Sequence, residues 1–371
     1  GDDRRTRVEF DASNFSVEDM IADDKVVITI SHLGYVKRTL LNEYRAQSRG
    51  GVGSKGSSVR SADFVEHIFM ATNHNYILFF TEKGRCYWKR AFEIPEGDKS
   101  SKGRAILNLI NIEPDDKVKA YVNVLNLKDE DYINNHYIVL CTKNGIIKKT
   151  SLEAYSRPRT NGINAVIVRD GDELLTARLT DGNSELLIAS RQGKVVRCNE
   201  SEFRPMGRGA SGVKAISLEP QDDYVIGMLS TNDDSEDILV VSENGFGKRS
   251  QLKYDKDKNL GYRPTHRGGK GVGTLKVTDK TGGIIALTNV TDDDDLMIIN
   301  RSGITIRMHV ADLRVMGRNT QGVKLINLRG KDSIASITKV DAEPDAEVAQ
   351  VDGTELPAEE NTAVDGEEVK E

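Results

Sequence analysis

The chain has 371 residues, of which 37% are hydrophobic and 30% are charged, and its formal net charge at pH 7 is −6. This composition supports a sizeable core under a polar surface. The sequence contains no long apolar run and no signal-peptide pattern, so we expect neither a membrane span nor a secreted protein. Cys86, Cys141 and Cys198 lack the spacing of a zinc site or a disulfide framework, which predicts three buried thiols in a reducing cytoplasm.

Negative charge is concentrated at the C-terminal end. Residues 341–371 contain twelve acidic residues and one basic residue, so this segment carries −11 and the other 340 residues carry +5. The segment has no aromatic residue and cannot bury enough apolar surface to offset the chain entropy lost on folding. We predict a disordered acidic tail, which either keeps the protein soluble or folds back and competes with a ligand of the positive part.

From residue 25 onward, one pattern recurs six times: an apolar strand, a turn with glycine and a basic strand. A short helical turn around residues 16–21 precedes the first copy. Asn144-Gly145 and Asn244-Gly245 favour the positive φ angles of a tight hairpin turn, and the apolar run at residues 238–241 is typical of a strand covered on both faces. The predicted hairpins span 26–38, 76–90, 137–149, 186–197, 238–249 and 296–307.

A second segment follows each hairpin, begins at a glycine, and is predicted to form a second hairpin. Four strands in each period of about 50 residues, repeated six times, predict an all-β, propeller-like fold with six four-stranded blades. A linear β-solenoid is the alternative. If the blades close into a ring, residues 322–340 should pair with the 26–38 hairpin, whereas an open spiral would leave them apart. The second segments are 102–122, 161–179, 211–229, 270–287 and 321–337, with a looser match after Lys55-Gly56.

Basic residues recur in the second strand of each hairpin. We place this strand at the outer edge of its blade, so that six edges form one positive rim. Lysine on an edge strand also blocks sheet-to-sheet aggregation, which is the alternative explanation. The hairpin residues are Lys37, Arg38, Lys89, Arg90, Lys148, Lys149, Lys194, Arg197, Lys248, Arg249 and Arg307.

A second basic set, in the loops that follow the hairpins, favours a binding surface. Arginine is the better phosphate ligand, and neighbouring glycines let a nucleic-acid backbone approach closely. Aggregation control requires neither. The loop residues are Arg45, Arg49, Lys55, Arg60, Lys99, Lys102, Arg104, Arg157, Arg159, Arg204, Arg208, Arg263, Arg267, Lys270, Arg314 and Arg318.

Such a rim suits duplex nucleic acid bound without sequence preference, with an affinity that falls steeply with salt. Tyr35, Tyr87 and Trp88 are expected to face the core, which argues against single-strand binding by base stacking. The glycine-rich stretch 47–56 is followed by β sequence, whereas a nucleotide-binding P-loop requires a helix there. Because no catalytic or metal-binding motif is found, we expect no active site, no cofactor and no metal in this chain.

Residues 1–340 resemble the C-terminal domain of the A subunit of bacterial DNA gyrase, a type IIA topoisomerase. The family's signature box reads Gln-Arg-Arg-Gly-Gly-Lys-Gly, and a near-intact relative occurs here at residues 266–271. Ser48 replaces one arginine of the first box, and residues 52–54 interrupt it. The residues that match the first box are Gln47, Arg49, Gly50, Gly51, Lys55 and Gly56.

The resemblance implies a six-bladed β-pinwheel over residues 25–340, after a linker over residues 1–24 and before the tail at 341–371. It implies a non-catalytic, monomeric, cytoplasmic domain that wraps double-stranded DNA, with Arg49 and Lys55 as central phosphate contacts. Its partners would be the gyrase B subunit and the catalytic core of the A subunit, where the holoenzyme would use ATP and Mg²⁺. The alternatives are the equivalent domain of topoisomerase IV and a propeller-type scaffold for protein interaction.

Overall fold

The computed structural model describes residues 17–31, 33–41, 65–98, 101–220, 222–302, 305–328, 330 and 332–341. The chain divides into two units, and every described helix and strand belongs to the unit that comprises residues 1–45 and 54–342. The predicted acidic tail after residue 341 and residues 1–16 of the predicted linker lie outside the described residues. The short turn expected near residue 18 is confirmed as the 3-10 helix η1 (Val17–Met20).

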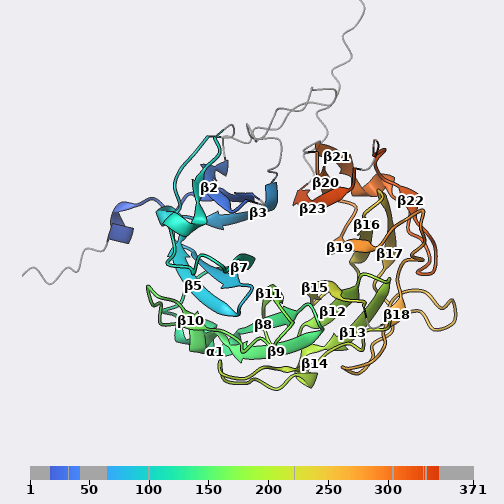
Figure 1. Ribbon diagram of the computed structural model, residues 1–371, viewed down its shortest axis with the longest axis horizontal. Helices are drawn as coiled ribbons and strands as arrows, with labels where there is room; N and C mark the ends of the chain where they lie inside the picture. Colours follow the sequence, from blue (N-terminus) through green and yellow to red (C-terminus); the bar gives the residue numbers. More distant parts are fainter. Residues whose placement is uncertain are drawn as a thin grey trace, which may run out of the picture. The chain divides into compact units, whose positions relative to one another are not determined.

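Among the described residues, six antiparallel hairpins each belong to a separate sheet, and we number these sheets blade 1 to blade 6 in chain order (Figure 1). The six predicted hairpins are therefore confirmed. The turn glycines from Gly34 to Gly245 have φ angles between +78° and +86°, as a tight hairpin turn requires. The hairpin strands are β1 (Lys25–Ser31) and β2 (Tyr35–Leu40), β4 (Tyr76–Thr81) and β5 (Arg85–Arg90), β8 (Tyr137–Thr142) and β9 (Ile146–Ser151), β12 (Glu185–Ser190) and β13 (Lys194–Asn199), β16 (Asp237–Ser242) and β17 (Phe246–Gln251), and β20 (Asp294–Asn300) and β21 (Thr305–His309).

Each hairpin pairs on one side with an inner strand of its own repeat. These strands contact one another from blade to blade, and the amide of Asn123 in β7 donates a 3.3 Å hydrogen bond to the carbonyl of Met70 in β3. The Ser336 hydroxyl in β23 donates a 3.2 Å hydrogen bond to the Val65 carbonyl in β3, so the blades of this unit form a closed cycle. The inner strands are β3 (Val65–Thr72), β7 (Val118–Val124), β11 (Leu174–Thr180), β15 (Val225–Thr231), β19 (Ile284–Val290) and β23 (Ile334–Asp341).

The expected pairing of residues 322–340 with the 26–38 hairpin is wrong. β23 pairs instead with β20 of its own blade and meets β3 alongside. The cycle therefore closes through contacts between inner strands, in the same way that the other neighbouring blades meet.

On its other side each hairpin of blades 1 to 5 pairs with a two-residue outer strand that comes from the following repeat. For example, Tyr35 and Val36 of blade 1 pair with Ala105 and Arg104, which follow the hairpin of blade 2. The predicted second hairpins are therefore wrong, because their two strands lie in different blades. The outer strands are β6 (Arg104–Ala105), β10 (Ile163–Asn164), β14 (Val213–Lys214), β18 (Val272–Gly273) and β22 (Val323–Lys324).

The sequence predicts six four-stranded blades, and the structure shows five, in a β-propeller-like arrangement, with a sixth sheet of three strands, β21-β20-β23, among the described residues. Residues 42–64 of the first repeat lie outside the described part of the chain.

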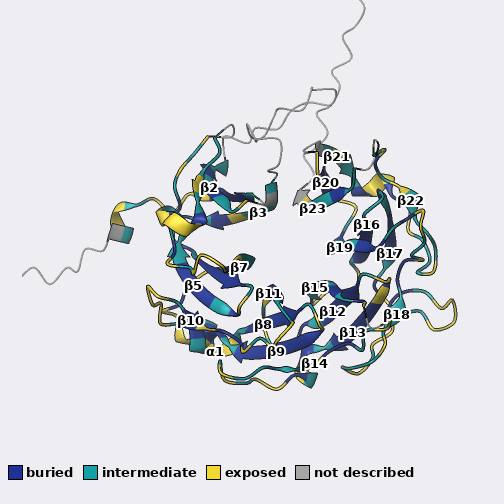
Figure 2. Ribbon diagram, in the orientation of Figure 1, coloured by how far each residue is buried: buried dark blue, intermediate teal, exposed yellow. Residues whose placement is uncertain are grey.

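The core lies between successive blades, where the hairpin strands are buried along their length (Figure 2). All six residues of β16 are buried, as the continuous apolar run predicts. Between blades 2 and 3, Leu78 and Phe80 pack in one cluster with Ile138 and Leu140. Each such side chain contributes about 1.5–3 kcal/mol on burial. The three cysteines are free and buried, as expected.

Short helices fill the connections between strands. The α-helix α1 begins after Asp129, whose carboxylate accepts a 3.1 Å hydrogen bond from the Tyr132 amide and so caps the first turn. Each of the others is a single 3-10 turn that turns the chain after a strand. These elements are η3 (Ala91–Glu93), η4 (Ile106–Asn108), α1 (Glu130–Asn135), η5 (Leu152–Tyr155), η6 (Glu200–Glu202) and η7 (Val310–Asp312).

Candidate nucleic-acid interface

Among the described residues, five loops carry the chain from one blade to the outer edge of the preceding blade, and we call them crossing loops. Each starts at a buried apolar or aromatic residue and ends at a glycine of positive φ that precedes the outer strand. A Cβ added to Gly212 would lie 2.4 Å from the Ile147 carbonyl oxygen, so the chain can approach the hairpin this closely only at glycine. The crossing loops over blades 1 to 5 are residues 94–103, 155–162, 203–212, 262–271 and 313–322.

Backbone hydrogen bonds hold four of these loops in the same register against the hairpin. In each loop, the amide three residues after the buried first residue donates to the carbonyl of the fourth residue after the turn glycine. This shared bond aligns the loops residue by residue. The pairs are Gly97 with Arg38 at 2.9 Å, Met206 with Lys149 at 2.8 Å, Thr265 with Arg197 at 2.7 Å, and Met316 with Arg249 at 2.7 Å.

This alignment shows that the loops over blades 3, 4 and 5 share the pattern Arg-x-x-x-Arg-x-x-x-Gly. The first arginine of each pair is exposed, and among the described residues it has no carboxylate partner. Each of these loops brings two guanidinium groups to the edge of its blade. We predicted these arginines from the sequence but missed their shared spacing, which the sequence alone contains. The pairs are Arg204 and Arg208, Arg263 and Arg267, and Arg314 and Arg318.

Two of the three second arginines are less exposed than the first. Arg208 and Arg318 are half-buried, and Arg267 is exposed. The Arg318 guanidinium donates a 3.0 Å hydrogen bond to the side chain of Asn259, while its buried Nε has no protein partner. In the loop over blade 4, the Arg267 amide donates to the Glu202 carboxylate at 2.8 Å.

The loops over blades 1 and 2 depart from this pattern. Over blade 1, Pro95 replaces the first arginine, Glu96 and Asp98 add negative charge, and the Lys102 ammonium lies 3.6 Å from the centre of the Tyr35 ring. Lys99 lies outside the described residues. Arg104, in the outer strand that follows, is exposed.

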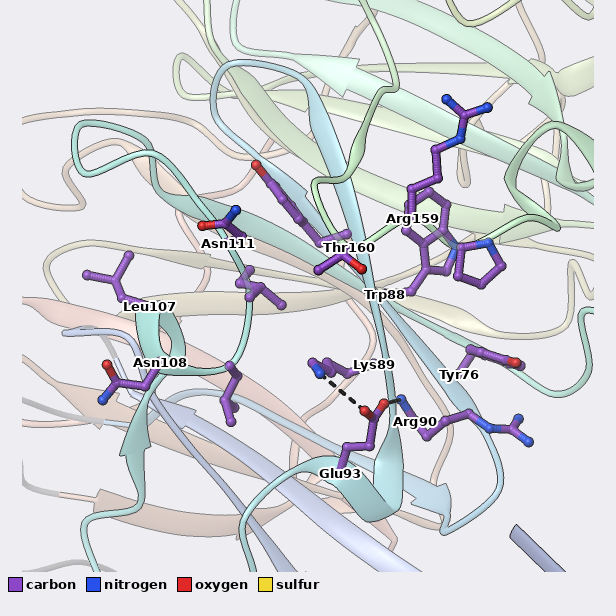
Figure 3. Close-up of a pocket in the computed structure, with 14 residues that line it drawn as sticks. Tyr76, Trp88, Lys89, Arg90, Glu93, Leu107, Asn108, Asn111, Arg159 and Thr160 are labelled. Atoms are coloured by element: carbon purple, nitrogen blue, oxygen red, sulfur yellow. Dashed lines mark hydrogen bonds and ion pairs between the residues drawn. The ribbon is translucent and has the colours of Figure 1, made fainter. Parts of the chain in front are cut away.

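The loop over blade 2 is two residues shorter than the loops over blades 3 to 5. Arg157 and Arg159 are both exposed in it, and the Arg157 side chain is 89% exposed. A pocket of about 490 Å³ lies beside β5, and its lining includes Lys89 and Arg159 (Figure 3).

The structure corrects the placement of the basic hairpin residues. We expected them at an exposed outer edge, but the outer strand and the crossing loop cover that edge. Charged groups enter a protein interior only with partners, and each of these has them. The contradicted residues, all less than 9% exposed, are Lys37, Lys148, Lys149, Arg197, Lys248 and Arg249.

The buried lysines at the third position after the turn glycine hold the crossing loops. The Lys37 ammonium donates to the carbonyls of Asp98 and Ser101 at 3.0 and 2.9 Å. The Lys148 ammonium donates to the carbonyls of Ala165 and Arg208, both at 2.6 Å.

Lys248 repeats this arrangement in blade 5. Its ammonium donates to the carbonyls of Gly317, at 2.7 Å, and of Arg318, and to the Thr320 hydroxyl at 3.3 Å. Burial, together with the charge of Arg318, lowers the pKa of Lys248 to about 7. Burial and the charge of Arg208 lower the pKa of Lys148 to about 8.

The basic residues at the fourth position pair with carboxylates instead. These ion pairs occupy the opposite face of the hairpin strand, because successive side chains of a strand alternate. They neutralise the charges that we had assigned to the rim. The pairs are Arg38 with Glu96 at 2.9 Å, Lys149 with Glu200 at 2.8 Å, Arg197 with Glu185 at 3.1 Å, Arg249 with Asp237 at 2.6 Å and with Asp292 at 2.5 Å, and Arg307 with Asp295 at 2.5 Å.

Three further basic hairpin residues differ from one another in their exposure and in their partners. Lys89 is half-buried and pairs with Glu93 at 3.1 Å. Arg90 pairs with Glu18 of η1 and stacks over the Tyr76 ring at 4.1 Å. Lys194 is exposed, as predicted.

The signature box itself is not tested by the structure. All of its matched residues, with the two arginines that flank it, lie outside the described residues, and their phosphate contacts stay predictions. These residues are Arg45, Gln47, Arg49, Gly50, Gly51, Lys55, Gly56 and Arg60.

The described residues contain no cluster of histidine, cysteine or carboxylate side chains that could hold a metal ion. No helix among them is long and apolar enough to cross a membrane. As expected, Tyr87 and Trp88 are buried, whereas Tyr35 is half-buried beneath Lys102.

A family model described as DNA gyrase C-terminal domain, beta-propeller, matches residues 25–72, 75–120, 136–181, 184–232, 236–291 and 294–341. The DNA gyrase A subunit of Staphylococcus epidermidis strain ATCC 12228 is 38% identical over 347 residues, which cover 93% of this chain and 38% of the relative. The corresponding gyrase protein of Staphylococcus aureus strain MRSA252 is 38% identical over 363 residues, which cover 96% and 40%. The chain thus spans about two fifths of the length of these curated relatives.

Two solved structures have the same fold. A structure of the DNA gyrase A C-terminal domain matches with a TM-score of 0.69 at 23% identity, covering 85% of this chain and 99% of that chain. The C-terminal domain of DNA topoisomerase IV matches with a TM-score of 0.68 at 24% identity, covering 88% and 96%. At these identities the likeness shows the fold alone.

Proposed function

This chain belongs to the family of DNA gyrase C-terminal domains, and we propose that it binds duplex DNA without sequence specificity along the crossing loops at its blade edges. The observation that supports this proposal best is the arginine pair at the same register in the loops over three consecutive blades. Paired guanidinium groups suit phosphate oxygens, and contacts to the backbone alone carry no sequence information.

The exposed guanidiniums differ from the buried hairpin cations in what they can do. A guanidinium in solvent can replace a counterion at a phosphate, whereas an ion-paired, buried one would first have to lose its carboxylate. Six arginines, two in each of three loops, would neutralise about six phosphates, so the logarithm of the affinity should fall with the logarithm of salt concentration with a slope of about −5.

Contacts along successive blade edges favour DNA that bends along them. Smooth bending of a 20–30 base-pair site costs roughly 1–6 kcal/mol, which contacts distributed over several blades can offset. We therefore propose wrapping, and not only binding, as the domain's contribution.

In the whole protein, this domain would present wrapped DNA to the gyrase B subunit and to the catalytic core of the A subunit. That assembly, a cytoplasmic type II topoisomerase, would use ATP and Mg²⁺ to introduce negative supercoils. The DNA-cleaving and ATP-hydrolysing centres would lie outside this chain, which we propose to be a monomer when isolated.

A salt series of duplex binding tests the proposal. The variant Arg208→Ala, Arg267→Ala, Arg318→Ala should bind less tightly, and its salt slope should be smaller by about three. The matched control removes three exposed lysines outside the crossing loops, Lys25, Lys117 and Lys128. If both variants lose the same affinity, the crossing loops are not the binding surface, and a salt-independent affinity of the parent chain would remove the proposal altogether.

The equivalent domain of topoisomerase IV is a second candidate, because its fold matches as well as that of gyrase. The family model and the curated relatives favour gyrase. The handedness of the supercoils that this chain imposes on a relaxed, nicked and religated plasmid would decide between them: wrapping strong enough to trap writhe of one sign supports gyrase.

A further inference from the structure

Two buried lysines lie directly behind the loop arginines of blades 3 and 5. Lys148 in β9 and Lys248 in β17 are each 1% exposed, and each donates to the backbone carbonyl of the arginine in front of it, Arg208 and Arg318. In blade 4 the same position of the hairpin holds the buried, uncharged Val196.

No carboxylate among the described residues pairs with either ammonium. On the face of β17 that carries Lys248, the charged neighbour is Arg318 of the crossing loop, and the cross-strand neighbour in β16 is Val240. The charge of the same arginine also acts on the buried phenol of Tyr262. The carboxylates of blade 5 face Arg249, on the opposite side of the strand.

Blade 3 has the same set of groups. Arg208 is the charged group that acts on Lys148, and it also acts on the buried phenol of Tyr155 in η5 and on the buried thiol of Cys86 in β5. Across the hairpin, Lys148 faces Leu140 of β8. Each site thus places two cations together with neutral groups, and an anion bound to the arginine would offset their repulsion.

We propose that the buried ammonium groups of Lys148 and Lys248 are positioning residues for DNA, which hold Arg208 and Arg318 toward the phosphates and add a second positive charge behind each. This inference rests on the proposed function. It makes the DNA affinity of these two blades depend on protons taken up by side chains that do not themselves touch DNA.

Loss of the proton removes the second positive charge at both sites, and at Lys248 it also weakens the anchoring of the loop. A neutral amine donates two hydrogen bonds where the ammonium donates three, so Lys248 gives up one of its three acceptors, and the site loses one positive charge. Burial lowers the pKa of Lys248 to about 7 and that of Lys148 to about 8, so the affinity for DNA should fall as the pH rises through this range and level off below it.

Stability of the free protein should change in the opposite direction. Because the folded pKa of Lys248 is below the ordinary value of 10.5, the unfolded chain binds more protons between about pH 7 and 10.5, and stability rises with pH across that window. If these lysines had only a structural role, duplex affinity and the free energy of unfolding would change in the same direction with pH. Opposite changes indicate that the charge of the lysines contributes to DNA binding.

The experiment measures duplex affinity from pH 6 to pH 9 at constant ionic strength. All proteins carry His266→Asn, which removes the imidazole of the crossing loop over blade 4. The parent should bind about tenfold less tightly at the high end for each lysine whose pKa DNA raises by one unit. The variant Lys148→Arg, Lys248→Arg keeps both charges and does not titrate, so it should bind well at every pH. Lys194→Arg, an exposed control on blade 4, should keep the parent's pH profile.

An Arg variant that retains the parent's pH dependence would overturn the inference. If that variant fails to fold, calorimetry of the parent binding DNA at pH 7.5 in two buffers of different ionisation enthalpy gives the answer: proton uptake is expected, and zero uptake refutes it. Failure of the proposed function gives a different result, since no protein would then show salt-dependent binding even at pH 6.

Discussion

At the edges of blade 1 and blade 5, a buried hairpin lysine holds the carbonyls of a crossing loop of the same length. Lys37 holds Asp98, and Lys248 holds Gly317 at the equivalent position. The surfaces of the two loops nevertheless differ: that over blade 5 carries Arg314 and Arg318, whereas that over blade 1 has Pro95 and two acidic residues in place of this pattern. The comparison separates two roles of positive charge. The buried hairpin lysines stabilise the crossing loop in both blades, whereas the exposed basic residues of the loops differ from blade to blade.

The largest effect on stability should come from the feature that the two edges share, the glycine at the end of the crossing loop. Gly322→Ala would place a Cβ 2.4 Å from the Gly247 carbonyl oxygen at φ +77°, and Gly103→Ala one at 2.5 Å from the Val36 oxygen at φ +80°. Each should lower the free energy of unfolding by about 3 kcal/mol, measured by urea denaturation. Gly330→Ala has the same type of φ but open space, and should cost about 1 kcal/mol. Unequal losses at Gly103 and Gly322 would contradict the shared construction.

The next effect concerns the surface in which the edges differ. Arg314→Ala with Arg318→Ala should weaken duplex binding roughly tenfold or more, because charge-assisted hydrogen bonds contribute about 1.5–3 kcal/mol each before neighbouring contacts compensate. Lys102→Ala with Arg104→Ala at the edge of blade 1 removes the same charge and should cost about threefold at most, because Glu96 and Asp98 already weaken that edge. Fluorescence anisotropy with a labelled duplex measures both. Equal losses of affinity would show that DNA binds equally to the edges of blade 1 and blade 5.

A smaller gain should follow when the edge of blade 1 is given the chemistry of blade 5. Pro95→Arg with Asp98→Gly introduces the residues found at positions 314 and 317. We expect about threefold tighter duplex binding and a salt slope steeper by about one. Pro95→Ala with Asp98→Gly serves as the control for loss of the acidic charge. A gain of the same size in the control would assign the effect to Asp98 alone.

The smallest effect on stability and affinity should come from Tyr35, whose ring contacts the Lys102 ammonium at the edge of blade 1. Tyr35→Leu should lower the free energy of unfolding by about 0.5–1 kcal/mol, the usual value of an exposed cation–π contact. Duplex affinity should change by less than twofold, since Lys102 keeps its charge. A larger loss of affinity would mean that the tyrosine takes part in DNA binding.

The sequence predicted the hairpins and the repeat well, because period, turn glycines and apolar runs are local signals. It failed at the outer strands, since a two-residue strand such as Val213–Lys214 has no hydrophobic period and pairs with a different repeat. That failure explains the misplaced hairpin cations: without the exchanged strand, Lys248 and Arg249 occupy what would be an exposed edge. The burial of a charged residue depends on what covers it, which a local pattern does not contain.

The candidate site was partly visible in the sequence. Arginines beside glycines in the loops were correctly singled out, and the spacing shared by the pairs at 204 and 208, 263 and 267, and 314 and 318 was available but unused. The anchoring of these loops could not be predicted, because the acceptors of Lys248 lie 69 to 72 residues away. The crossing loop over blade 5 brings them together, because it carries the chain from blade 6 to the outer edge of blade 5.

The most direct test is chemical modification of arginine side chains with and without bound duplex, read residue by residue by mass spectrometry. If the crossing loops hold the DNA, Arg204, Arg263 and Arg314 are modified in the free protein and protected by the duplex, while the buried Arg197 and Arg249 stay unmodified in both states. Protection of Arg197 and Arg249 on DNA binding, with the three loop arginines unaffected, would contradict the account.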